Sequence, residues 1–168
     1  AFLSGDGEKV ATLLKDYILS CFSYYGFSSE RSYEVMVLTL TSLLFEEALV
    51  QSEQNDGEGR SDLTLYSKKE GGFALILEFK YCGAKTRNDF LDKESCDALA
   101  QIKDRDYPEK ARKLGKRKII LFGIGITALL AAAAYALFGY SPRDDLRLFT
   151  RIPLFLAFTV NCSIIAPL

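Results

Sequence analysis

Three side chains near the middle of the sequence could together hold a metal ion and activate water. Asp62 begins a segment in which polar and apolar residues alternate, and Glu78 and Lys80 close the apolar segment Phe73–Lys80. These patterns predict two neighbouring β-strands, the second of them buried. Because side chains alternate along a strand, Glu78 and Lys80 share one side and Phe79 lies on the other. A short turn between the strands then brings Asp62 level with Glu78.

Two carboxylates at one point repel each other unless a cation or a proton lies between them. Magnesium suits such a pair, because it takes oxygen ligands, retains several waters and commonly uses one or two carboxylates with a substrate phosphate. We therefore expect Mg²⁺, or Mn²⁺ in its place, at Asp62 and Glu78. The pattern leaves a second interpretation open, in which Glu78 and Lys80 form a salt bridge where the strand reaches solvent.

The amino-acid composition excludes several kinds of chemistry. The sequence has no histidine, which excludes Ser-His-Asp and Cys-His catalysis, zinc sites built with histidine and nucleases that use a histidine base. The four cysteines show neither a C-x-x-C pair nor zinc-site spacing, so we interpret them as reduced thiols of a cytoplasmic protein. Lys and Arg number 21 against 22 Asp and Glu, so net charge indicates no particular partner.

Two helices are predicted before the strands that carry the acidic residues. The first covers Gly7–Phe22 and is capped by Asp6, and the second is capped by Ser29. The buried stripe of the second helix is expected to consist of Tyr33, Val37, Leu40 and Leu44. We interpret the aromatic residues Tyr33 and Tyr107 as core residues.

The remaining pattern predicts a sheet followed by a helix and one more strand. In order, we expect a short strand, a polar turn, two strands, a helix broken near Pro108 and a last strand: Ala48–Val50, Gln54–Arg60, Asp62–Tyr66, Phe73–Lys80, Asp89–Leu114 and Ile119–Ile126. Gly123 and Gly125 in the last strand are interpreted as positions of close packing, because no helix-opening glycine pattern follows them. The fold class is therefore α/β (α+β), with helices flanking a sheet.

The C-terminal part of the sequence allows two interpretations. Residues Ile119–Ser141 carry no charge and follow three basic residues, which is typical of a membrane span. If Ile119–Ile126 forms the last strand, however, Thr127–Tyr140 is too short to cross a bilayer. We favour a domain over residues 1–126 and an apolar extension over 127–168, made of a buried helix and a further strand or apolar segment. The alternative is a membrane hairpin over 119–168 that anchors the protein in the inner membrane.

An ordered set of motifs resembles one protein family. Asp62 followed by Glu78-Phe79-Lys80 matches the D…(D/E)-x-K signature of the PD-(D/E)XK nuclease superfamily. The surrounding sequence resembles the bacterial branch usually found C-terminal to an AAA-ATPase-like domain. The matching segments are Leu3-Ser4-Gly5-Asp6, Glu30-Arg31-Ser32-Tyr33, Asp56 to Leu63, Ile76 to Lys80, and Ala98 to Ile102 continuing to Tyr107. The resemblance covers about residues 2–126.

The resemblance implies a fold, an activity and partners. The fold is a restriction-endonuclease-like αβββαβ core with a mixed central sheet, here with an extra N-terminal helix and an apolar tail. The activity is metal-dependent hydrolysis of phosphodiester bonds in DNA, or in RNA. The partner implied besides nucleic acid is an upstream AAA-ATPase-like domain. Two alternatives stay open: a catalytically silent module that binds or regulates beside an ATPase, and a membrane-anchored nuclease-like protein.

The resemblance also implies roles for individual residues. Asp62, Glu78 and the backbone carbonyl of Phe79 would ligate the metal. Lys80 would orient or activate the attacking water and stabilise the charge that builds on phosphorus. Gln101 would contact metal-bound water or the phosphate from the helix after the strands. Without the resemblance, Gln101 reads equally well as an amide on a helix surface.

Further residues would approach the site from a helix and from basic segments. Glu30 would reach it through water or a second metal ion. Lys103–Lys118 contains eight basic and three acidic residues. This density suits a nucleic-acid backbone, so Lys103 and Arg105 are candidate contacts, and Arg60 is a further candidate. A solvated helix surface explains the same density.

Overall fold

The computed structural model describes residues 1–21, 30–56, 59–81, 88–129 and 155–165. Within these ranges, five strands form one sheet in the order β1-β2-β3-β4-β5. Only β3 and β4 run parallel, and every other neighbouring pair is antiparallel. The strands are β1 (Ala48–Asp56), β2 (Gly59–Ser67), β3 (Phe73–Tyr81), β4 (Lys118–Leu129) and β5 (Phe155–Ile165). The sheet is therefore mixed, as expected.

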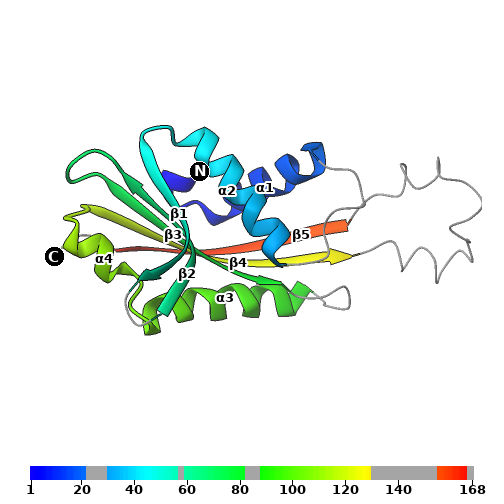
Figure 1. Cartoon of the computed structure of the whole chain (residues 1–168). Coiled ribbons are helices and arrows are strands. Elements are labelled where there is room, and N and C mark those ends of the chain that lie inside the picture. The colour runs from blue at the N-terminus through cyan, green and yellow to red at the C-terminus, as the bar shows by residue number, and fades with distance from the viewer. Residues whose placement is uncertain (22–29, 57–58, 82–87, 130–154, 166–168) are drawn as a thin grey trace, which may run out of the picture.

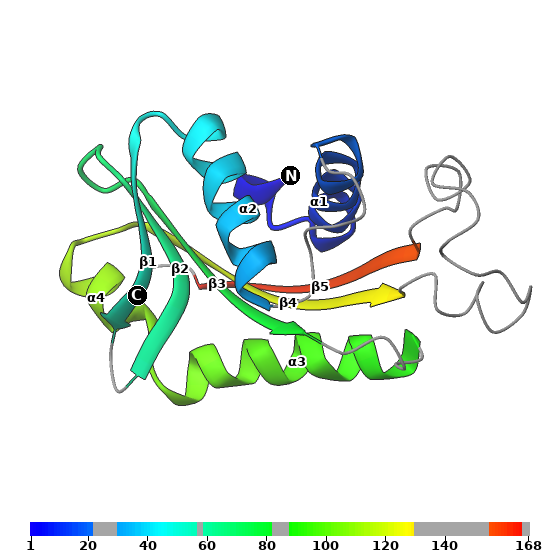
Figure 2. The ribbon, with the colours of Figure 1, turned by 45° about the vertical axis from the view of Figure 1, so that its right-hand side comes forward.

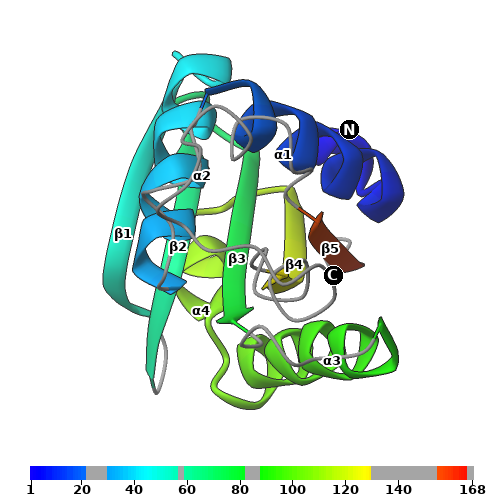
Figure 3. The same cartoon turned by 90° about the vertical axis from the view of Figure 1, so that its right-hand side faces the viewer.

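Helices cover both faces of this sheet (Figures 1 and 3). The helix α1 (Gly7–Cys21), α2 (Glu30–Leu44) and a short 3₁₀ turn η1 (Phe2–Ser4) lie on one face. On the other face lies α3 (Asn88–Asp104), followed by α4 (Pro108–Lys113). From α2 to β4, the elements follow the predicted order of a helix, three strands, a helical segment and a strand.

Local sequence explains where these helices begin and end. The Asp6 carboxylate accepts a hydrogen bond of 3.1 Å from the Lys9 N–H, so it caps α1 as predicted. The predicted break near Pro108 separates α3 from α4. Asp106 adopts a positive φ of 47° at this break, and its carboxylate accepts hydrogen bonds from Arg112. The corner between the two helices is thus held by an ion pair.

The alternation of side chains along β3 divides the core into two layers. Leu75, Leu77 and Phe79 pack with α1 and α2 in the larger layer. Ala74 and Ile76 pack with α3 and α4 in the smaller one. Burial of apolar surface in each layer stabilises the fold by roughly 25 cal/mol for each Å² removed from water. The residues that follow Ile76 on its side of β3 are Glu78 and Lys80, so the smaller layer gives way to charged groups at the end of the strand.

Three expectations from the sequence need correction. The stretch 54–60 was expected to be a polar turn, but β1 continues to Asp56 and β2 begins at Gly59. As a terminal strand of the described sheet, β1 needs no continuous apolar pattern. Leu44, expected in the buried stripe of α2, is 51% exposed because α2 ends there. Finally, β4 runs to Leu129, so the helix expected from Thr127 cannot begin there.

The C-terminal segment adds a strand to the sheet. This strand, β5, pairs antiparallel with β4, from the pair Ile119 and Ile165 to the pair Leu129 and Phe155. The further strand expected in this segment is therefore present. The rest of the expected buried helix, 130–140, lies outside the described residues. Within the described ranges, no helix is both long and apolar enough to cross a membrane. The domain boundary at residue 126 stays a prediction.

Glycines in β4 allow α3 to approach the sheet. A Cβ on Gly123 would overlap the Ser95 carbonyl oxygen, and one on Gly125 would lie 2.6 Å from the Leu91 carbonyl oxygen. Neither glycine has a positive φ. Space, rather than backbone conformation, therefore requires glycine at both positions, which agrees with the expected close packing.

We predict that Gly123→Ala destabilises the protein by about 3 kcal/mol, because the added methyl group must push α3 away from β4. Urea unfolding measures this change. Gly115→Ala is the matched control: its Cβ would meet open space, and only the φ of 64° is unfavourable, at about 1 kcal/mol. Equal losses of stability in the two variants would contradict close packing as the reason for Gly123.

Candidate functional site

The register between β2 and β3 brings the two predicted carboxylates together. Their ladder runs from Tyr66–Ala74 to Leu63–Leu77, so the next residues along the two strands are Asp62 and Glu78. At this point the Asp62 Oδ2 accepts a hydrogen bond of 2.8 Å from the Phe79 N–H. This hydrogen bond to the backbone of β3 holds the Asp62 side chain beside Glu78.

Lys80 lies on the same side of β3 as Glu78, as the alternation predicted. Its Nζ is 3.6 Å from Glu78 Oε1. The Lys80 side chain is 31% exposed and that of Glu78 only 3%. The salt bridge of the alternative interpretation therefore forms, but its carboxylate is buried rather than solvent-exposed.

A helix completes the cluster from the other side. The Gln101 side chain, on α3, donates a hydrogen bond to Glu78 Oε1. Its Nε2 also lies 3.2 Å from the hydroxyl of the fully buried Tyr107, a second hydrogen-bond partner. Close approach of α3 to β4 places Gln101 within reach of β3. The arrangement brings together a carboxylate pair, an ammonium group and an amide, which are the groups needed to hold a cation and bind a phosphate.

The comparison with known protein families agrees with this geometry. The family model of the PD-(D/E)XK nuclease superfamily matches residues 28–128. The chain belongs to the PD-(D/E)XK nuclease superfamily. No curated protein and no solved structure matches the chain. The matched range contains α2, β1, β2, β3, α3, α4 and all of β4 except Leu129, so the restriction-endonuclease-like αβββαβ fold is confirmed.

Within this PD-(D/E)XK protein, Glu78 occupies an unfavourable environment for a negative charge. Burial raises the pKa of its carboxyl to about 8, and the nearby charge of Asp62 acts in the same direction. The Lys80 ammonium lowers the pKa, but by less. The second carboxylate oxygen of Glu78, Oε2, is buried and has no hydrogen-bond partner among the described residues. A buried acceptor without a partner lowers the stability of the fold by about 1–3 kcal/mol or more. A cation or a proton bound at this atom would remove that penalty.

The donor set fits a hard divalent cation. No group of three or more histidine, cysteine, aspartate or glutamate side chains within the described ranges could hold a metal ion. Two carboxylates with water and substrate oxygens are nevertheless the usual ligands of Mg²⁺. The unpartnered Glu78 Oε2, close to a second carboxylate, is the observation that fits such an ion.

The other candidate residues lie at different distances from this cluster. Glu30 is the first residue of α2, but its side chain is outside the described part of the structure. Arg60, at the start of β2, and Lys103 and Arg105, near the end of α3, are exposed. Tyr107 was expected only as a core residue, yet its hydroxyl contacts the Gln101 amide. The sequence offered one signal for this role: Tyr107 ends one of the segments that resemble the nuclease family.

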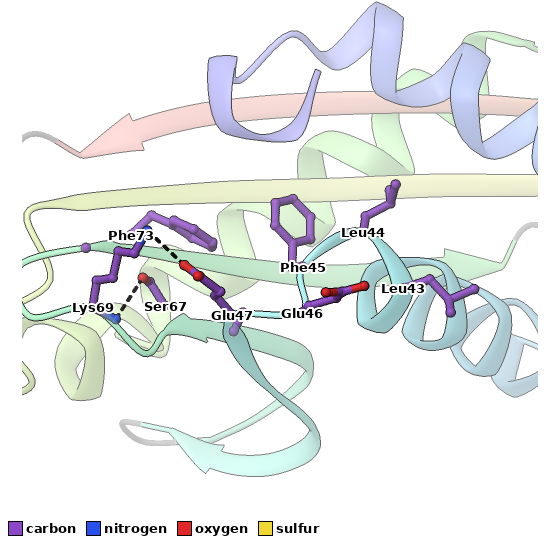
Figure 4. Close-up of a pocket in the computed structure, with 10 residues that line it drawn as sticks. Leu43, Leu44, Phe45, Glu46, Glu47, Ser67, Lys69 and Phe73 are labelled. Atoms are coloured by element: carbon purple, nitrogen blue, oxygen red, sulfur yellow. Dashed lines mark hydrogen bonds and ion pairs between the residues drawn. The ribbon is translucent and has the colours of Figure 1, made fainter.

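A pocket of about 560 Å³ lies elsewhere on the protein (Figure 4). Its lining includes Phe45 and Phe73 together with Glu47 and Lys69, which form an ion pair of 2.8 Å. Phe73 begins β3, whereas Glu78 lies near the end of that strand. The pocket therefore sits at the opposite end of β3 from the acidic cluster and does not belong to it.

We predict that the free energy of unfolding of the metal-free protein falls as pH rises from about 4.5 to about 8. The folded protein binds the Glu78 proton more tightly than the unfolded chain does, so the slope in this window is negative, up to about 1.4 kcal/mol per pH unit. Urea unfolding in EDTA at several pH values measures it.

Glu78→Gln should remove this contribution and raise stability at pH 8 by a few kcal/mol. The control is Glu70→Gln, which changes an exposed glutamate on the turn between β2 and β3 and should keep the wild-type slope. A wild-type slope in Glu78→Gln would mean that this carboxyl is not the buried titrating group.

Proposed function

We propose that the protein is a metal-dependent nuclease that hydrolyses phosphodiester bonds in DNA, with Mg²⁺ at Asp62 and Glu78. The observation that carries this proposal is the meeting of these two carboxylates with Lys80 on one side of the sheet, around a buried oxygen atom without a partner. Membership of a nuclease superfamily supports phosphodiester hydrolysis as the reaction. Mn²⁺ would replace Mg²⁺, since it takes the same ligands.

Each residue of the cluster has a part in this chemistry. The bound metal ion would supply Lewis acidity and lower the pKa of water. The Asp62 and Glu78 carboxylates, with the Phe79 backbone carbonyl, would hold it. Lys80, partly exposed beside Glu78, is placed to orient the attacking water and to stabilise negative charge on the phosphate. Gln101 would hold Glu78 in position and contact a water or phosphate oxygen.

The complete set of Asp62, Glu78 and Lys80 argues against a catalytically silent module of the same fold. A silent module would have no need to keep a buried carboxylate opposite a second one, because burial and the Asp62 charge both disfavour the ionised form of Glu78. The further parts of the proposal, a cytoplasmic location and an adjoining AAA-ATPase-like domain as partner, rest on the sequence alone.

We predict that Lys80→Ala lowers kcat for cleavage of a DNA duplex in Mg²⁺ by about 100- to 1,000-fold, because the fixed positive charge near the phosphate is lost. It should still bind Mn²⁺, as measured by calorimetry, since both carboxylates remain. Asp62→Ala should lose both cleavage and Mn²⁺ binding.

The matched control for these variants is Lys69→Ala, which removes an ammonium group paired with Glu47 at the far end of β3. It should cleave at the wild-type rate. If Lys80→Ala and Asp62→Ala turned over DNA as fast as Lys69→Ala, the proposed catalytic cluster would be wrong.

We also predict that Gln101→Ala lowers cleavage about 10- to 100-fold, because the amide that holds Glu78 is removed. Gln101→Glu should be worse than Gln101→Ala, since it adds a third carboxylate to the pair. Steady-state kinetics in Mg²⁺ measures both. An equal rate in Gln101→Glu and the wild type would show that this side chain does not contact the acidic cluster during turnover.

A further inference from the structure

Gly59, at the start of β2, is a glycine whose backbone does not require one. Its φ is not positive. A Cβ built on it would instead lie 2.8 Å from Arg105 Cδ and 2.8 Å from Tyr107 Cε1. A glycine at this position therefore makes room for two particular side chains that cross the beginning of β2.

These two side chains come from the corner between α3 and α4, whose shape is well held. The Tyr107 N–H donates to the Ile102 carbonyl, and Asp106, with its positive φ, is held by Arg112. The Arg105 N–H donates to the Gln101 carbonyl, which continues the pattern of α3 for one more residue. Figure 2 shows this end of α3 beside the first residues of β2. Arg105 thus leaves a rigid corner rather than a free loop.

The same corner is connected to the acidic cluster. Tyr107, which contacts Gly59 beside Arg105, bonds through its hydroxyl to Gln101, and Gln101 bonds to Glu78. Gly59 also precedes Asp62 by three residues on the same strand, which is roughly 10 Å of extended chain. Arg105 therefore lies beside the candidate metal site, at a distance that one side chain and a short piece of nucleic-acid backbone can cover.

Arg105 differs in its contacts from the three basic residues of α4. Arg112 pairs with Asp106, Lys113 pairs with Glu109, and Lys110 contacts Gln51 and the Tyr66 ring. The exposed Arg105 guanidinium forms no ion pair or hydrogen bond with any part of the chain that the structure describes. A charge near a helix C-terminus also interacts with the helix dipole. The dipole alone does not explain why Gly59 makes room for the Arg105 side chain.

We propose that Arg105, positioned by Gly59 and Tyr107, binds a backbone phosphate of the substrate a few nucleotides from the bond that is cut. This inference rests on the proposed nuclease function and names a residue that sets where the nucleic acid lies relative to the acidic cluster. Each DNA strand carries one phosphate per about 3.4 Å of helix axis, so roughly 10 Å corresponds to two or three phosphates. A contact to phosphate carries no base preference, so its effect is the same for every sequence.

Binding of a fluorescent DNA duplex tests this inference separately from cleavage. The measurement uses proteins with the Lys80→Ala substitution, in Mg²⁺, over a series of salt concentrations. Arg105→Ala should weaken binding about 5- to 10-fold at 0.1 M salt and reduce the slope of log Kd against log salt by about 0.9. The loss should be equal for duplexes of unrelated sequence.

The control is Lys113→Ala, which removes one positive charge from the C-terminal end of α4, where Lys113 is paired with Glu109. It should change Kd less than 2-fold and leave the salt slope as it was. Gly59→Ala keeps every charge but displaces Arg105 and Tyr107, so it should weaken binding as Arg105→Ala does. Should Gly59→Ala fail to fold, as judged by thermal melting, Arg105→Ala and Lys113→Ala still decide the question.

Two results would overturn the inference, and they are distinguishable from failure of the proposed function. If Arg105→Ala binds DNA with the same affinity and salt slope as the protein that carries Lys80→Ala alone, Arg105 is not part of the interface. This holds even if the wild-type protein cleaves DNA. Equal losses in Arg105→Ala and Lys113→Ala would indicate a diffuse charge effect with no specific contact. If the wild-type protein neither binds nor cleaves the duplex, both the inference and the proposed nuclease function are wrong.

Discussion

The candidate site depends on one unfavourable interaction, the placement of Glu78 in a buried position opposite Asp62. Burial and the second negative charge both disfavour the ionised carboxylate, and together they raise its pKa to about 8. The surrounding groups compensate only in part: Gln101 and Lys80 contact Oε1, while Oε2 has no hydrogen-bond partner in the described structure. A cation between the carboxylates would relieve the repulsion and satisfy this atom. A bound divalent cation would therefore make the site more favourable.

The fold supports this arrangement through the two faces of β3. Leu75, Leu77 and Phe79 on one face belong to the larger core layer, with α1 and α2 against them. The opposite face of the same strand can then end in charged groups without leaving β3 poorly packed. The second requirement is a helix close enough to reach Glu78, and Gly123 and Gly125 meet it by allowing the α3 backbone to contact β4. Core packing thus uses one face of β3, and the site uses the other face together with α3 and β4.

The sequence predicted those parts of the site that follow from local periodicity. Alternation along a strand was enough to place Glu78 with Lys80 and to bring Asp62 opposite them, as the register confirms. The structure places the Tyr107 hydroxyl against Gln101, which periodicity could not predict, because the chain leaves helical geometry at Asp106 before reaching Tyr107. The sequence pattern also did not predict the length of β1 or the pairing of β5 with β4. The polar residues of β1 resemble a turn when the sheet is unknown, and the partner of β5 is far away in sequence.

The apolar C-terminal part illustrates why hydropathy alone was ambiguous. An uncharged run that includes β4 looks like a membrane span, because a strand buried on both faces is as apolar as a lipid-facing helix. The two differ in where the backbone hydrogen bonds go: to neighbouring strands in a sheet, and within the segment in a helix. Amino-acid composition does not report this difference. Here β4 pairs with β3 on one side and with β5 on the other, so its backbone groups are satisfied by the sheet. The same central position explains its glycines: a strand between two neighbours and under a helix has space only where side chains are absent, and there the helix carrying Gln101 comes close to the acidic pair.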